Sequence, residues 1–177
     1  MQPAVGGWPH PWPNVEELAR VLPADQWTLI GGLMTQLHAI NAGIGVLRPT
    51  NDVDIVLHIE SSRGVPARTA AALESIGYQL LPGIDPRNQV AHRFTRGASH
   101  VQRSDIVDVL VADHAAPSVQ ELLRGKAMVK VEGATQALRR TVDAVLEITP
   151  GVPTTIQCAR PVRCPDLEGG GLPDRLA

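Results

Sequence analysis

The sequence predicts an α/β domain of the α+β kind, in which a mixed β-sheet is flanked by helices. Two kinds of segment support this prediction. Val53–Ile59 and Asp105–Val111 are rich in β-branched residues, as buried strands are. Leu33–Ile40 and Val65–Ile76 place apolar residues at helical spacing. A chain of 177 residues has the usual length of one domain and can bury a substantial core.

Proline and glycine divide the chain into three parts. The first 13 residues contain four Pro and two Gly, so we expect residues 1–13 to form an extended arm. Asn14 is a candidate N-cap for a helix that ends at Pro23. We expect the core to span residues 14–150. Residues 151–177 read as an irregular tail, which loses all periodicity after Thr155-Ile156.

The remaining elements follow from the same patterns of apolar residues and turn residues. The expected helices cover residues 15–22, 33–41, 65–76 and 118–128, and a helix or turn begins at residue 133. The expected strands cover residues 27–31, 53–59, 78–81, 90–95, 105–111 and 141–148.

Composition and charge describe an ordinary globular protein. Apolar residues make up 44% of the chain and the net charge is −2, so no overall basic excess indicates a nucleic-acid groove, although a local patch is compatible with these values. The chain has neither an apolar run of membrane-spanning length nor a secretory signal pattern. We therefore expect a cytoplasmic protein that does not interact with membranes.

Asp52 and Asp54 are the first candidate site residues. Side chains two residues apart in a strand project from the same face, about 6–7 Å apart along the chain. Two carboxylates so placed repel each other unless a proton or a cation lies between them, and Mg²⁺ prefers carboxylate ligands. The alternative is a turn or capping role, since Asp readily bonds nearby backbone groups.

Gly31 and Gly32 lie between a predicted strand and a predicted helix. Backbone N–H groups at such a junction can approach an anion closely. The alternative is a simple tight turn.

Farther along the chain, Asp108 lies in the middle of an aliphatic strand, where an unpaired carboxylate is costly. Asp108 should therefore face a cation or a donor, and an arginine such as Arg93 is one alternative.

The stretch Trp27–Ile59 resembles the nucleotidyltransferase superfamily typified by DNA polymerase β, and most closely its AbiEii-like toxin branch. The shared pattern is a Gly-Gly pair that opens a helix, followed by an Arg-x-Thr-x-Asp-x-Asp strand. The order of elements is similar over about residues 15–145, but only this motif is specific. The matching residues here are Gly31, Gly32, Arg48, Thr50, Asp52 and Asp54.

The resemblance implies a polymerase β-like nucleotidyltransferase core. It also implies Mg²⁺-dependent transfer of a nucleoside monophosphate from an NTP, with two ions held by Asp52, Asp54 and a third carboxylate on the adjacent strand. Asp108 is our choice for the third carboxylate, and Asp105 is the alternative. The sequence does not identify the acceptor, whether a tRNA, a protein or a small molecule, and the resemblance implies a cognate antitoxin as the partner.

The resemblance also gives roles to the remaining motif residues. Gly31 and Gly32 would cradle the triphosphate of the nucleotide with their amides. Arg48 would pair with phosphate or brace the acidic strand, and Thr50 would bond the entrance of that strand. The motif departs from the superfamily at Leu33, where many members have Ser, so a side-chain contact to phosphate is missing.

AbiEii-like proteins continue beyond this core with further helices, so we expect the C-terminal helical part to be missing here. We interpret residues 151–177 as an irregular tail that is out of frame after a frameshift near Gln157–Arg163. Codons can be written for Cys164–Asp174 that, read one base later, encode Ala-Leu-Ile-Leu-Lys-Ala-Ala-Ala-Tyr-Leu, which has helical character.

Two other functions remain open at this stage. One is a truncated, catalytically inactive remnant of the fold that only binds a nucleotide or a partner. The other is a different Mg²⁺ enzyme with clustered Asp residues, such as a nuclease or a phosphohydrolase.

Overall fold

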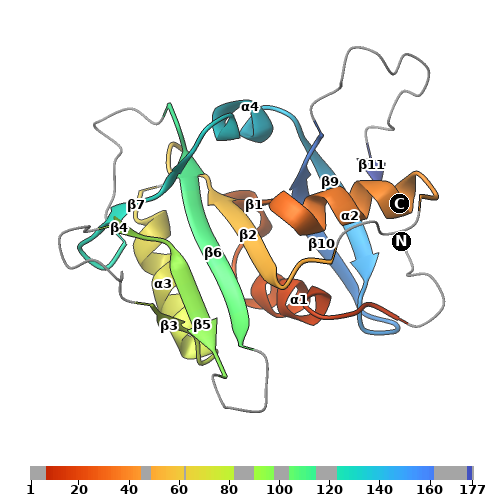
Figure 1. Cartoon of the computed structure of the whole chain (residues 1–177), viewed down its shortest axis with the longest axis horizontal. Coiled ribbons are helices and arrows are strands. Elements are labelled where there is room, and N and C mark those ends of the chain that lie inside the picture. Colours follow the sequence, from red (N-terminus) through yellow and green to blue (C-terminus); the bar gives the residue numbers. More distant parts are fainter. Residues whose placement is uncertain are drawn as a thin grey trace.

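The computed structural model describes residues 7–44, 49–61, 63–81, 90–97, 104–114, 123–161 and 175–176. These residues form a nine-stranded mixed sheet with flanking helices, and a separate pair of short strands (Figure 1). The predicted mixed sheet with flanking helices is therefore confirmed. The helices are α1 (Trp12–Val21), α2 (Gly31–Asn41), α3 (Val65–Ser75) and α4 (Ala134–Leu138), with a 3₁₀ turn at Ala24–Gln26.

The large sheet has the strand order β11-β9-β10-β1-β2-β6-β5-β3, and β8 pairs with β6 outside this path. Its members are β1 (Trp27–Ile30), β2 (Asp52–Leu57), β3 (Gln79–Leu80), β5 (Arg93–Arg96), β6 (Asp105–Ala112), β8 (Lys130–Val131), β9 (Thr141–Glu147), β10 (Pro153–Ala159) and β11 (Arg175–Leu176). The separate pair consists of β4 (Val90–Ala91) and β7 (Ala127–Met128).

The central strands have two different faces because side chains alternate along a strand. On one face, residues of β2 and β6 join the main core together with residues of α1, α2 and α3. On the other face, residues of the same two strands form a smaller cluster with α4. The main core includes Val53, Ile55, Val107, Val109, Leu18, Leu37 and Leu73, and the smaller cluster includes Val56, Leu110, Ala112 and Ala134.

The start of the chain differs from the predicted arm over residues 1–13. Helix α1 already begins at Trp12, with a proline within its first two positions. Trp12 is buried and its ring packs edge-on against Trp8, so apolar contacts fix a segment that proline alone would leave extended. Asn14 is a buried residue inside the helix and not its cap. Residues 1–6 lie outside the described part.

The core extends beyond the predicted boundary at residue 150. Strand β10 lies between β9 and β1, antiparallel to the first and parallel to the second. Its residues Thr154, Ile156 and Cys158 are buried, and the residues between them are more exposed. Residues 153–159 are therefore part of the domain and not of an irregular tail. Of the residues predicted to be out of frame, 162–174 and 177 lie outside the described part.

The predicted helix over residues 118–128 is wrong where the structure describes it. Leu123 and Lys126 form a bridge, and Ala127–Met128 is strand β7. Arg124 and Gly125 both have positive φ angles, which an α-helix cannot accommodate. Residues 118–122 of this prediction are not among the described ones. Strand Thr141–Glu147 follows as predicted.

A hydrogen-bond chain joins β1 and the preceding 3₁₀ turn to His58, the residue after β2. His58 Nδ1 lies 2.8 Å from the Asp25 carbonyl, which can only accept, so Nδ1 donates. Nε2 then accepts from the Thr28 hydroxyl at 2.8 Å. This arrangement requires a neutral ring, and burial lowers the pKa of His58.

We expect this histidine to make folding less stable as the pH falls below about 6.5, the ordinary value for His. The unfolded chain then takes up a proton that the folded state resists, so the stabilisation present above that pH is lost. The difference between the wild type and His58→Gln in urea unfolding at pH 7.5 and 5.5 measures the loss, because other titrating groups contribute equally to both proteins. His114→Gln, at a side chain that is 79% exposed, is the control and should leave the loss unchanged.

Candidate metal centre

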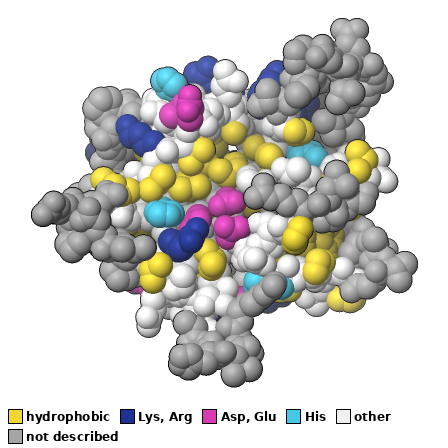
Figure 2. Space-filling model, in the orientation of Figure 1, with side chains coloured by type: hydrophobic (Ala, Val, Ile, Leu, Met, Phe, Trp, Pro, Cys, Tyr) yellow, Lys and Arg dark blue, Asp and Glu magenta, His cyan; other side chains and the backbone are white. Residues whose placement is uncertain are grey.

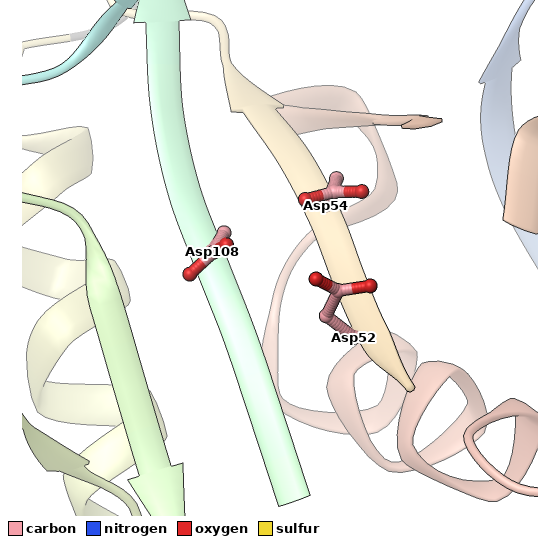
Figure 3. A group of neighbouring side chains, drawn as sticks. All are labelled: Asp52, Asp54 and Asp108. Carbon is pink, nitrogen blue, oxygen red and sulfur yellow. The ribbon is translucent and has the colours of Figure 1, made fainter. Parts of the chain in front are cut away.

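Three carboxylates meet on two neighbouring strands. Asp52 and Asp54 lie on β2 and Asp108 lies on the parallel strand β6, where Asp54 and Asp108 are in register. Figure 3 shows the three side chains on the same side of the two strands. One ligand oxygen of each lies within 4.8 Å of the others, so the group could hold a metal ion. The structure therefore brings together the three predicted carboxylates.

Each carboxylate of this cluster has a different partner. The Thr50 hydroxyl donates to Asp52 Oδ1 at 2.6 Å. The backbone N–H of Gly32 donates to Asp54. Arg93 donates to Asp108 through two bonds, from Nε to Oδ1 at 2.8 Å and from Nη2 to Oδ2 at 2.7 Å.

The sequence left open whether Asp108 faces a cation or an arginine, and the structure is compatible with both. Asp108 pairs with an arginine, and it also lies in the carboxylate cluster. The pair accounts for a carboxylate whose side chain is only 9% exposed, since burial of an unpaired charge is costly. Figure 2 shows acidic side chains at the centre of this face, beside a basic side chain and a band of hydrophobic ones.

Asp54 has the most perturbed environment of the three carboxylates. Burial raises its pKa most, and the charges of Asp52 and Asp108 raise it further, to about 6. The Gly32 amide and the charge of Arg93 act in the opposite direction. A carboxyl group in this position favours either a proton or a cation. Three carboxylate oxygens are also the ligands of hard divalent cations, so the residues fit such an ion.

The Gly31-Gly32 pair allows the start of α2 to lie directly against the acidic strand. Gly31 has a φ of +69°, and a Cβ atom there would lie 2.0 Å from Asp54 Oδ2. A Cβ on Gly32 would lie 2.7 Å from the Cβ of Thr50. The helix N-terminus therefore stabilises the Asp54 carboxylate. Contact of these amides with a triphosphate stays a prediction.

Two other predicted residues lie outside this cluster or outside the described part. Asp105, the alternative third carboxylate, pairs with Arg96 at 3.0 Å and with His10 at 3.0 Å, and it does not join the metal-binding group. Arg48 is among the residues that the structure does not describe. The amide of Gly32 as a partner of Asp54 was missed, because sequence spacing gives no signal for a contact between a helix start and a strand.

No family model matches the chain, and neither the curated proteins nor the solved structures give a match. The functional assignment therefore depends on the geometry of the carboxylate cluster and on the motif around it. In the described ranges, no helix combines the length and the apolar character needed to cross a membrane.

Proposed function

We propose that this protein is a Mg²⁺-dependent nucleotidyltransferase, which transfers a nucleoside monophosphate from an NTP to an acceptor. The observation that carries the proposal is the group of three carboxylates on the parallel strands β2 and β6. The Gly-Gly pair at the start of α2, directly beside Asp54, adds support because it matches the first part of the superfamily motif. By this proposal the sheet and helices form a polymerase β-like core.

Asp52, Asp54 and Asp108 would hold the metal ions. Bound there, Mg²⁺ would activate the attacking hydroxyl and neutralise charge on the reacting phosphate. Thr50 orients Asp52 by its hydrogen bond, and Arg93 fixes both oxygens of Asp108. The Gly32 amide holds Asp54 at the start of α2. These contacts keep the three carboxylates oriented before any ion or substrate arrives.

The substrate range follows from the resemblance to AbiEii-type toxins. On that basis we propose a tRNA or a protein as the acceptor and a cognate antitoxin as the partner, as in a toxin–antitoxin system. A second candidate is a nucleotide-binding or partner-binding protein without catalytic activity. One observation favours it, since Arg93 already bonds both oxygens of Asp108 and so reduces the need for a cation there.

Transfer of radiolabel from each of the four NTPs into total tRNA or total protein tests these candidates. We expect incorporation that requires Mg²⁺ and is lost in Asp52→Ala. Asp143→Ala, at an exposed carboxylate on β9, is the matched control and should keep the activity. Nucleotide binding without incorporation would support the inactive candidate instead. Degradation of nucleotide or RNA without incorporation would indicate a nuclease or a phosphohydrolase.

A further inference from the structure

We propose that the charge of Arg93 makes the carboxylate cluster a site for one divalent cation when no nucleotide is bound. The inference rests on the proposed function only in requiring that Asp52, Asp54 and Asp108 hold such a cation. Arg93 acts on the cation by its charge and is not assigned contact with the substrate.

Strand register places Arg93 in one row with two of the carboxylates. Asp54 of β2 is opposite Asp108 of β6, and Asp108 is opposite Arg93 of β5. Arg93 lies on β5, which borders β6 on the side opposite β2, and its guanidinium donates to Asp108 with bonds of 2.8 and 2.7 Å. Each carboxylate oxygen has two lone pairs, so each oxygen of Asp108 can accept from Arg93 and still coordinate an ion. Cation binding therefore does not require the pair to break.

The charges of the three carboxylates and of Arg93 limit how many cations the site accepts. The three carboxylates contribute −3 and Arg93 contributes +1, which leaves −2. The field of Arg93 reaches across the row, since its charge acts on Asp54 as well as on Asp108. One divalent cation neutralises this total. A second cation would leave an excess of positive charge until the phosphates of a nucleotide arrive.

A purely structural role for Arg93 leads to a different expectation. If the arginine only fastened β5 to β6, its removal would leave Asp108 misoriented and weaken metal binding. If its charge limits the site, removal would strengthen metal binding, because the repulsion between guanidinium and cation disappears. The two roles therefore predict changes of opposite sign.

Titration of the full chain with Mn²⁺ in the absence of nucleotide distinguishes the two roles of Arg93. Electron paramagnetic resonance measures the free ion. We expect the wild type to bind one Mn²⁺ and Arg93→Gln to bind Mn²⁺ about tenfold more tightly. Arg93→Lys keeps the charge and should resemble the wild type. Arg124→Gln is the matched control, since it removes the same charge from an arginine that pairs with Glu74 on α3. Equal or weaker binding by folded Arg93→Gln, or equal behaviour of the Gln and Lys variants, would overturn the proposal.

A second pair of variants decides the matter if Arg93→Gln does not fold. Asp108→Asn changes the summed charge of the three cluster positions and Arg93 from −2 to −1 and should weaken Mn²⁺ binding. Adding Arg93→Gln restores −2 and should recover about tenfold in affinity, whereas no recovery would contradict the charge argument. If removal of the Arg93 charge tightens Mn²⁺ binding but the protein transfers no nucleotide, this proposal is supported and the proposed function is contradicted. If the protein transfers nucleotide but Mn²⁺ binding does not depend on the Arg93 charge, the proposed function is supported and this proposal is contradicted. A wild type that binds no Mn²⁺ would overturn both.

Discussion

Asp54→Asn is expected to reduce nucleotidyl transfer at least about 1,000-fold and to make the metal-free protein more stable at pH 7. The activity falls because a neutral amide is a poor ligand for a divalent cation at the centre of the cluster. The stability rises because the substitution removes a carboxylate that burial and two neighbouring charges disfavour. We expect a gain of about 1–2 kcal/mol, reduced from the full effect of the pKa shift because the side chain is partly exposed.

The sign of the pH dependence follows from the pKa of Asp54. Its folded value of about 6 lies above the ordinary 3.8, so the folded state binds a proton that the unfolded state has lost. The contribution of Asp54 therefore lowers stability as the pH rises from about 4 to 6, and this penalty is nearly complete by about pH 7. The gain of Asp54→Asn should accordingly be present at pH 7.5 and absent at pH 3.5 in urea unfolding experiments.

Asp143→Asn, at an exposed carboxylate on β9, is the control for the change of charge alone. It should leave activity and stability near their original values. A capping or ion-pairing role for Asp54 would give the opposite result for Asp54→Asn, with stability lowered by about 1–3 kcal/mol and metal binding changed only through unfolding.

Gly31→Ala is expected to have the second large effect, a loss of more than about 3 kcal/mol in stability together with loss of metal binding. Two causes add. The φ of +69° disfavours any residue with a Cβ, and that Cβ would lie 2.0 Å from Asp54 Oδ2. Either the carboxylate or the start of α2 must move, and both belong to the proposed metal centre. Chemical denaturation and Mn²⁺ titration of the purified variant measure the two losses.

The chain offers a close control for the backbone effect. Gly43 has a φ of +70°, and a Cβ there would meet nothing within 4 Å. Gly43→Ala should therefore cost only about 1–2 kcal/mol and leave metal binding intact. In an Asp54→Ala background, the added cost of Gly31→Ala should shrink, because the two closest atoms, Oδ2 and Cγ of Asp54, are then absent. Equal costs for the two glycine variants would contradict this account of the junction.

Sequence patterns predicted the central part of the sheet because the signal for a buried strand is local. Within β2, and again within β6, the β-branched residues lie close together in the sequence. In β6, the alternation of Asp108 with valines placed the Asp108 side chain on one face. Strand β10 gave a weaker signal, since Thr and Gln alternate with its buried residues and Pro and Gly precede it. Its place in the sheet depends on pairing with β1 and β9, which no local pattern contains.

The candidate site, like the sheet, could be predicted from the sequence only where the signal is local. Spacing alone placed Asp52 and Asp54 on one face, because the two residues share a strand. Whether Asp108 faces a cation or an arginine could not be decided, because the answer depends on the register of β5 against β6. The structure gives a result that neither alternative contained, since Asp108 contacts Arg93 and still has its place beside Asp52 and Asp54.

The position of β10 has a consequence for the order in which the protein can be completed during synthesis. Strand β1 bonds β2 on one side and β10 on the other, so it forms an edge of the sheet until residues 153–159 have left the ribosome. A nascent chain that ends near residue 150 would expose the unpaired backbone groups of β1, close to the acidic strand, to any other extended chain. The acidic half of the sheet thus forms early along the chain, but protection of its edge is among the last steps of folding.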